Sequence, residues 1–320
     1  MSSALGKVFG VRTSQRLYPW REPKSPAPAA TLLLLRDSPS GIEVLMTRRS
    51  TKASFAPGAF VFPGGVVDRA DATALGLDPD LLSPSRLLQV SSESPKVQHE
   101  LHQIYAQAAL RECWEEMHLL LAGSLEGGGP LDFDMLSPSI TGLARHPEEG
   151  FDRALAARDL RACIESVYSF SHWTTDRDLA RRFDVRFLVA RAPLGQSPLA
   201  DEGEQFEPCW VQPAEALARH VAGDFSMIFP TIRTLEQLKP FACVDDVLEH
   251  ANRMFEQGSL WRSCPRGGYL HAKDMRFTED EMPFAELELV SPDGQLVHHL
   301  DWQHEHAVPL LRYLYRYTAP

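Results

Sequence analysis

Short apolar runs separated by turn residues make the beginning of the chain strand-rich. Residues 30–35 (ATLLLL) and 42–47 (IEVLMT) each have the length and composition of a strand, and the polar segment 37–41 (DSPSG) lies between them. Two such runs joined by a short turn predict an antiparallel hairpin. The glycine- and proline-rich segment 55–65 follows, and the alternation of its apolar residues predicts one further short, buried strand.

A helical pattern replaces the strand pattern at residues 96–122. Apolar side chains recur there at steps of three and four residues, at Leu101, Ile104, Ala108 and Cys113. This spacing places them on one face of a helix, and Gly123 marks its expected end. The preceding segment 72–95 is rich in serine, proline and glycine, and we expect it to be irregular.

The second half of the chain alternates predicted helices with predicted strands. In order, the patterns indicate a helix at 151–167, strands at 183–190 and 207–211, helices from 213 and at 231–238, and a hairpin at 285–297. The sequence contains no internal repeat. A mixture of this kind is compatible with an α/β protein but does not single out one fold.

The composition is that of an ordinary globular protein. Of the 320 residues, 44% are hydrophobic and 23% are charged, and the length suffices for one large or two ordinary domains. No apolar run reaches the roughly 18 residues that span a bilayer, and the N-terminus lacks the apolar core of a secretory signal. Five cysteines lie far apart without ligand spacing, which predicts reduced thiols and a cytoplasmic protein.

The net charge narrows the classes of partner. A formal charge of −11 argues against binding to a nucleic-acid backbone, because such a protein needs a basic surface. A small phosphate substrate is compatible with this charge, since a metal ion supplies positive charge locally. We therefore expect a small-molecule partner and neither nucleic acid nor membrane.

The candidate chemistry is concentrated in residues 111–116, RECWEE. Each residue of a helix turns by about 100°, so Glu112, Glu115 and Glu116 fall within one narrow arc. Like charges at this spacing cost about 0.2–0.5 kcal/mol, and the nearby helix end also disfavours anions. Mg²⁺ or Mn²⁺ would turn this repulsion into binding, because both prefer carboxylate oxygens. The alternative is a solvated acidic face.

A second motif, PGGVVDRAD at 63–71, precedes the acidic helix. Its paired glycines, Gly64 and Gly65, allow a sharp turn that brings backbone amides near an anionic ligand. Asp68 and Asp71 either add oxygen ligands or hold the arginine. Alone, the motif is also typical of a simple turn. Its position upstream of the carboxylate helix favours a shared site.

Together the two segments resemble the box of the Nudix hydrolase family, G-x5-E-x7-R-E-U-x-E-E-x-G-U, in which U is a bulky apolar residue. Gly65 takes the first position, residues 111–116 match the R-E-U-x-E-E core, and Leu119 fills the last position. Asp71 stands where glutamate is usual. His118 replaces the glycine after the core, so either the turn is reshaped or the helix runs on.

A long insertion interrupts this box. Residues 72–110 place 39 residues between Asp71 and Arg111, where the family pattern has seven. The lengthening costs only about 1.5 kcal/mol of loop entropy. Such a box is similar to the branch that contains the peroxisomal coenzyme A diphosphatase of animals and its bacterial relatives. Segments 55–65, 182–187 and 210–217 agree with that branch, but Ser54 stands where its signature has arginine.

The resemblance covers roughly residues 27–245 and implies a Nudix α/β/α sandwich with a mixed sheet. The implied organisation is an N-terminal segment at 1–26, a Nudix domain at 27–245 with its insertion at about 72–100, and a C-terminal extension at 246–320. The role of that extension is open between a cap over the active site, the surface of a homodimer, or both.

The resemblance also implies the residues of a metal-dependent hydrolase. The predicted ligands of a Mg²⁺ or Mn²⁺ ion, which would activate water for attack on a diphosphate, are Glu112, Glu115, Glu116 and Asp71. Arg111 would orient one of the glutamates. For substrate binding we expect Gly64, Gly65, Arg48 and Arg49, although the two arginines are also typical of a solvated surface. A general base is expected from a loop, with Glu204 as the candidate.

The expected substrate is a nucleoside diphosphate derivative, such as coenzyme A or acyl-coenzyme A. One alternative is a pyrophosphatase for ADP-ribose or dinucleotides. Another is a Nudix module that binds a ligand without catalysis. Loss of the glutamates would favour that module, and they are present.

Overall fold

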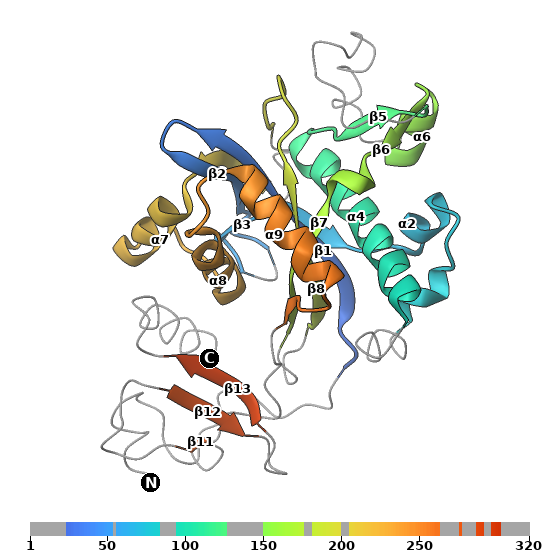
Figure 1. Ribbon diagram of the computed structural model, residues 1–320. Helices are drawn as coiled ribbons and strands as arrows, with labels where there is room; N and C mark the ends of the chain where they lie inside the picture. Colours follow the sequence, from blue (N-terminus) through green and yellow to red (C-terminus); the bar gives the residue numbers. More distant parts are fainter. Residues whose placement is uncertain are drawn as a thin grey trace.

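The computed structural model describes residues 24–53, 56–83, 94–126, 150–175, 181–199 and 205–262, together with the backbone of three strands near the C-terminus. The main body is an eight-stranded mixed sheet with helices on both faces (Figure 1). This arrangement confirms the expected α/β/α sandwich.

Strand β1 is central to the sheet. The strands are β1 (Ala27–Ser38), β2 (Gly41–Arg49), β3 (Phe60–Val61), β4 (Gly64–Val66), β7 (Tyr168–Thr174), β8 (Phe183–Arg191), β9 (Gln205–Val211) and β10 (Trp261–Arg262). Their order is β10-β7-β8-β1-β2-β3, while β4 pairs with β1 and β9 with β2. Strand β1 runs parallel to β8 and antiparallel to β2, where Leu35 lies opposite Val44. The predicted hairpin of the first two strands is therefore confirmed.

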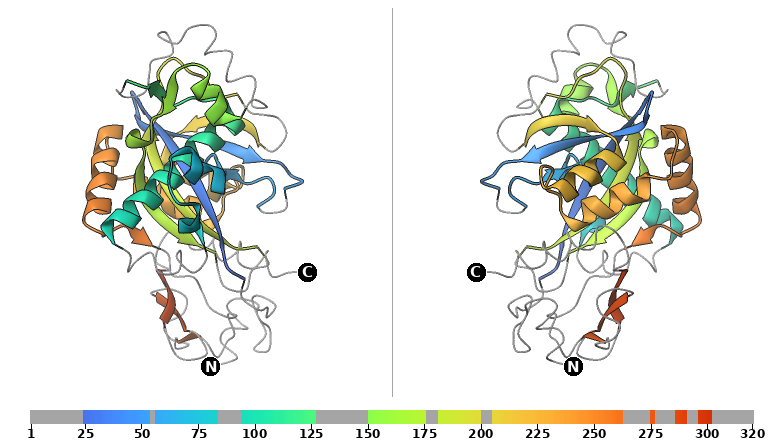
Figure 2. Two further views of the ribbon diagram at one scale, coloured as in Figure 1. Left: turned by 90° about the vertical axis from the view of Figure 1, so that its right-hand side faces the viewer. Right: turned by 90° about the vertical axis from the view of Figure 1, so that its left-hand side faces the viewer.

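The helices form two groups, one on each face of the sheet (Figures 1 and 2). One group comprises α2 (Arg69–Ala74), α4 (Pro95–Met117) and α6 (Phe151–Ala156). The other comprises α7 (Pro213–Ala222), α8 (Phe229–Leu238) and α9 (Val244–Glu256). Two short 3-10 helices, η1 (Pro79–Leu82) and η6 (Ile164–Ser166), and a two-stranded sheet of β5 (Ala122–Ser124) and β6 (Leu160–Ala162) lie outside the main sheet.

The leucine run of β1 shows how one strand supports both layers. Leu32 and Leu34 are fully buried in the core that contains α4, whereas Leu33 and Leu35 are fully buried in the core that contains α7, α8 and α9. Successive side chains of a strand point to opposite faces, so a strand between two helical layers needs an unbroken apolar run. Each buried leucine contributes about 1.5–3 kcal/mol.

Helix α4 is capped at both ends by local chemistry. Ser94 accepts a hydrogen bond from the amide of Val97 at 3.4 Å, and Pro95 takes the first helical position. The helix ends at Met117 because His118 adopts the left-handed conformation, with φ 54° and ψ 30°. The expected helix through Ala122 is therefore wrong at its C-terminal end. His118 takes the conformation that glycine usually supplies, so the turn survives the replacement.

Two sequence-based expectations fail where tertiary contacts decide the structure. The predicted helix at 151–167 is instead α6, β6 and η6, because β6 pairs with the distant strand β5. Helix α9 was not predicted, and it crosses the expected boundary at residue 245. Its buried residues Val244, Val247 and Ala251 complete the second core.

The hairpin expected at 285–297 is confirmed in the C-terminal extension. Strand β12 (Glu286–Val290) pairs antiparallel with β13 (Leu296–Asp301), and β11 (Met275–Arg276) pairs with β12. Within the described part of the chain, no helix is long and apolar enough to cross a bilayer.

Candidate active site

Arg111 on α4 lies at the centre of a polar cluster between α4, α2 and β4 and hydrogen-bonds several of its members. Its Nε donates to Oδ1 of Asp71 at 2.9 Å, and its Nη2 donates to Oδ2 of Asp71 at 3.2 Å and to the carbonyl of Val66 at 2.9 Å. Asp71 is only 1% exposed, and its Oδ2 also accepts the amide of Asp68 at 2.8 Å. Both oxygens of Asp71 are thus engaged within the protein.

This geometry favours a supporting role for Asp71 over the predicted role as a metal ligand. Of the two roles that the sequence left open for the aspartates, Asp71 holds the arginine. The sequence signalled only the contact of Asp71 with the amide of Asp68, since these two residues have the spacing of a capping box. The part played by the carbonyl of Val66 could not be read from the sequence, because every residue has such a carbonyl.

The same guanidinium holds two of the three glutamates. Nη1 of Arg111 donates to Oε1 of Glu112 at 2.9 Å and to Oε2 of Glu115 at 3.0 Å. One cation therefore positions two carboxylates that would otherwise repel each other on the helix surface. Within the described residues, the second oxygen of Glu112 and of Glu115 accepts no hydrogen bond.

The glycine bend contacts the other side of the carboxylate cluster. The amide of Gly64 donates to Oε2 of Glu116 at 3.0 Å. Strand β4 pairs with β1 here, and a Cβ on Gly64 would lie 2.3 Å from the carbonyl oxygen of Ala30. A Cβ on Gly65 would lie 2.3 Å from Cδ of Glu112. Only glycine fits at position 64, whereas a side chain at position 65 would displace the Glu112 carboxylate. The PGG motif therefore brings the backbone into contact with the glutamates.

Burial makes it costly to keep the carboxylates of this cluster charged. Glu116 is 8% exposed, and the side chains of Glu112 and Glu115 are 16% and 36% exposed. Burial raises the pKa of Glu112 and of Glu115 above the ordinary glutamate value, although the charge and hydrogen bonds of Arg111 act in the opposite direction. With Asp71, the cluster holds four carboxylates against one guanidinium.

This excess of negative charge and the all-oxygen donor set suit a hard divalent cation. In the described part of the chain, however, no three acidic, histidine or cysteine side chains are arranged to hold a metal ion. Glu112 and Glu115 are turned toward Arg111, and Glu116 is turned toward Gly64. The residues therefore fit a divalent ion in charge and chemistry, and binding would require the carboxylates to reorient.

The other predicted site residues are only partly placed. Arg48, near the end of β2, forms an exposed ion pair with Glu207 at 3.3 Å, and the amide of Arg49 donates to the carbonyl of Ala59 at 2.9 Å. Their contacts thus connect β2 with β9 and the loop before β3. Glu204, the expected general base, lies outside the described residues.

The chain is similar in sequence to known acyl-coenzyme A diphosphatases. The chain is 25% identical to the acyl-coenzyme A diphosphatase NUDT19 of Homo sapiens over 90% of this chain and 87% of that protein. It is 24% identical to the protein of the same name from Xenopus laevis over 79% of this chain and 73% of that one. No family model matches the chain.

One solved structure shows the same fold. The crystal structure of a Nudix hydrolase from Alicyclobacillus acidocaldarius matches with a TM-score of 0.55 and 24% identity, over 70% of this chain and 96% of that one. The sequence similarity, which extends over most of the chain, agrees with this likeness. The chain therefore resembles the Nudix hydrolases in fold and, in sequence, the acyl-coenzyme A diphosphatases among them.

Proposed function

We propose that this protein is a Mg²⁺- or Mn²⁺-dependent hydrolase that cleaves the diphosphate linkage of coenzyme A or an acyl-coenzyme A. The observation that carries the proposal is the approach of Glu112 and Glu116 to the bend at Gly64 and Gly65, with Glu115 joined to Glu112 through Arg111. The choice of substrate rests on the names of the relatives from Homo sapiens and Xenopus laevis.

The protein residues have distinct tasks in this proposal. A divalent ion on the three glutamates would supply Lewis acidity toward the diphosphate and lower the pKa of a water molecule. Arg111 binds the carboxylates of Glu112 and Glu115 on the helix surface, and Asp71 anchors Arg111 in turn. A substitution at Asp71 therefore acts on the site through Arg111.

The substrate-binding part of the proposal uses the glycine bend and the adjacent strand. Gly64 and Gly65 lack side chains, so the backbone approaches Ala30 and the Glu112 carboxylate closely. We assign the diphosphate oxygens to this bend. We assign phosphate contacts to Arg48 and Arg49, since the site is otherwise strongly negative. Glu204 is assigned as the general base of the loop before β9.

The experiment that tests the proposal compares Glu116→Gln with Glu100→Gln. Glutamine at 116 keeps an oxygen that can accept the amide of Gly64, so the fold should persist while the charge is lost. We expect a loss of about 100-fold to 1,000-fold in kcat. Glu100 lies on the same helix in an ion pair with the exposed Lys96, so Glu100→Gln removes the same charge outside the cluster and should retain activity.

The assay measures hydrolysis of coenzyme A in the presence of Mg²⁺ or Mn²⁺ and identifies phosphopantetheine among the products. Parallel reactions with acyl-coenzyme A, ADP-ribose and NADH distinguish the proposed substrate from the other diphosphates. Full activity of Glu116→Gln would refute the metal role of the glutamates. Hydrolysis of ADP-ribose or NADH alone would refute the substrate and leave the site intact.

A further inference from the structure

The segment that follows β8 is fastened to the C-terminal end of helix α4. The side chain of Gln196 pairs with the backbone of Leu120, since its Oε1 accepts the amide at 2.8 Å and its Nε2 donates to the carbonyl at 2.8 Å. The amide of Leu199 donates to the carbonyl of Met117, the last residue of α4, at 3.0 Å. That carbonyl is one of those that have no partner within the helix. These hydrogen bonds fix the segment after β8 at this end of the helix.

This attachment brings Leu199 near the glutamate cluster. Met117 directly follows Glu116 in the chain, and consecutive Cα atoms are about 3.8 Å apart. Together with the 3.0 Å contact between Leu199 and Met117, this spacing places the backbone nitrogen of Leu199 within about 10 Å of the Cα of Glu116. A nucleoside diphosphate derivative is longer than that distance. A substrate whose diphosphate lies at Glu116 can therefore reach Leu199 with the group that follows the diphosphate.

The side chain of Leu199 offers an apolar surface at this position. It is 53% exposed, although the backbone amide of the same residue is engaged. A single exposed leucine on a protein surface needs no explanation by itself. Here, however, it lies near the end of the helix that carries the three glutamates and Arg111. The polar cluster suits the phosphate part of a substrate, and Leu199 suits an apolar group next to it.

The proposed substrate has an apolar group at the matching place. In coenzyme A, one phosphate of the diphosphate is bonded through oxygen to a methylene group, and the next carbon carries a pair of methyl groups. In ADP-ribose and NADH, both phosphates are bonded to ribose units, which carry hydroxyl groups. The first group beyond the diphosphate therefore distinguishes coenzyme A from these other diphosphates, because it is apolar in coenzyme A and polar in the others.

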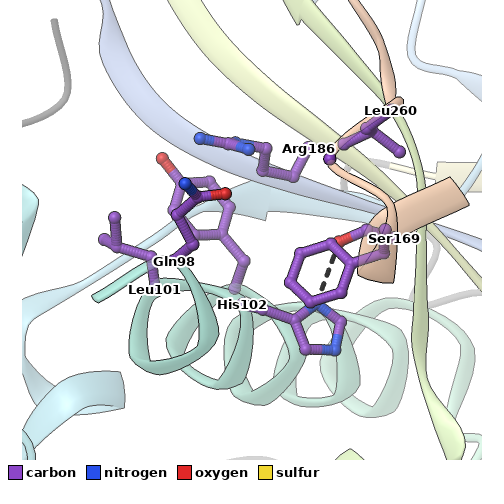
Figure 3. A pocket seen from close by; sticks show the side chains of 9 residues that line it. Gln98, Leu101, His102, Ser169, Arg186 and Leu260 are labelled. Carbon is purple, nitrogen blue, oxygen red and sulfur yellow. Dashed lines mark hydrogen bonds between the residues drawn. The ribbon is translucent and has the colours of Figure 1, made fainter. Parts of the chain in front are cut away.

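A cavity beside the N-terminal half of α4 is not an alternative location for this apolar group. Its wall includes Gln98, His102 and the buried Arg186 (Figure 3). The volume of the cavity is about 20 Å³, which admits one water-sized group. His102 also precedes Glu112 by ten residues, which corresponds to about 15 Å along a helix. The cavity is therefore both too small and too far from the glutamates.

We propose that Leu199 is a specificity-determining residue that contacts the dimethyl carbon next to the diphosphate of coenzyme A. This role rests on the proposed function of the glutamate cluster. Contact with Leu199 removes the two methyl groups from water, which favours coenzyme A over diphosphates that carry a ribose there. Gln196 is a positioning residue for this contact, because it fixes the segment that carries Leu199.

Calorimetric titration of the full chain in Mg²⁺ with phosphopantetheine and with ribose 5-phosphate tests the contact without requiring hydrolysis. The dimethyl carbon lies next to the phosphate end of the first ligand, and a ribose lies there in the second. We expect Leu199→Ser to weaken the binding of phosphopantetheine about tenfold and to leave the binding of ribose 5-phosphate within twofold. The matched control is Leu194→Ser, at a leucine of the same segment that is 65% exposed, and it should change neither affinity.

A conservative variant and a parallel assay complete the test. Leu199→Met keeps an apolar side chain and should retain the affinity for phosphopantetheine. An unchanged affinity of Leu199→Ser for phosphopantetheine would overturn the proposal, and so would an equal loss for both ligands or no binding of phosphopantetheine to the unmodified protein. Hydrolysis of coenzyme A by the unmodified protein is measured separately. If that hydrolysis is absent while the selective loss of affinity is observed, the proposed function fails and the contact at Leu199 stands.

Discussion

Substitution of Gly65 by alanine perturbs the candidate active site at a single, well-defined contact. The alanine Cβ would lie 2.3 Å from Cδ of Glu112 and 2.4 Å from each of its carboxylate oxygens. The backbone of Gly65 does not require glycine for its own conformation, so the whole effect of the substitution comes from this collision. The carboxylate of Glu112 has to move, because the strand β4 is held by pairing with β1.

The size of the effect follows from the distance. An ordinary contact begins at 3.4 Å, and 3.4 minus 2.3 gives a displacement of about 1.1 Å. A movement of this size is large enough to disrupt the 2.9 Å hydrogen bond between Glu112 and Arg111. A displacement of about 1 Å in a catalytic group lowers the rate about 100-fold, which corresponds to about 2.7 kcal/mol in the activation free energy.

The assay is metal-dependent hydrolysis of coenzyme A, with kcat and KM determined separately and with Tm measured alongside. Gly223→Ala is the matched control. Gly223 has φ +95° and a Cβ there would meet nothing within 4 Å, so this control tests backbone strain remote from the glutamates. We expect Gly223→Ala to lower stability by about 1 kcal/mol while its kcat is unchanged.

Gly65→Ala should show the opposite pattern, with a large loss in kcat and a small change in Tm. The reasoning is refuted if folded Gly65→Ala hydrolyses coenzyme A within threefold of the unmodified rate. Such a result would mean that the position of the Glu112 carboxylate does not limit the reaction, even if the protein is a hydrolase.

Two further predictions concern the charges of the cluster. Asp71→Asn should lower the free energy of unfolding in urea by about 3 kcal/mol, because it breaks a buried ion pair with Arg111. The control Asp80→Asn breaks an exposed ion pair and should change this free energy by less than about 1 kcal/mol. Equal losses in the two variants would argue against the anchoring role of Asp71. Burial raises the pKa of Glu112 in the folded protein. Without divalent ions, Glu112 therefore stabilises the fold below its unfolded pKa of about 4.5. This stabilisation is lost as the pH rises through the pKa of the folded state. At pH 8, Mg²⁺ at about 100 times its Kd should raise the free energy of unfolding by about 2.7 kcal/mol. The measurement compares this gain in the unmodified protein with the gain in Glu112→Gln. A gain that does not depend on pH would contradict the linkage.

The amino-acid sequence alone determined the features that depend on local periodicity. Helix geometry places Glu112, Glu115 and Glu116 on one arc whatever surrounds them, and the alternating burial of the β1 leucines follows from strand geometry. The hairpin of β1 and β2 is likewise local, since a short turn brings its strands together. The Nudix box is likewise defined by the types and spacing of its residues, so the resemblance was visible in the sequence.

Tertiary structure decided which side chains meet. Asp71 and Arg111 are 40 positions apart, and no local rule distinguishes an aspartate that binds metal from one that holds an arginine. Only folding brings Gly65 against Glu112, and only the pairing of β6 with β5 divides the segment that periodicity assigns to one helix. The buried state of Arg186 likewise depends on α4 covering β8. Contacts between distant segments depend on how the layers pack, and hydrophobic periodicity reports which face is buried but not what covers it.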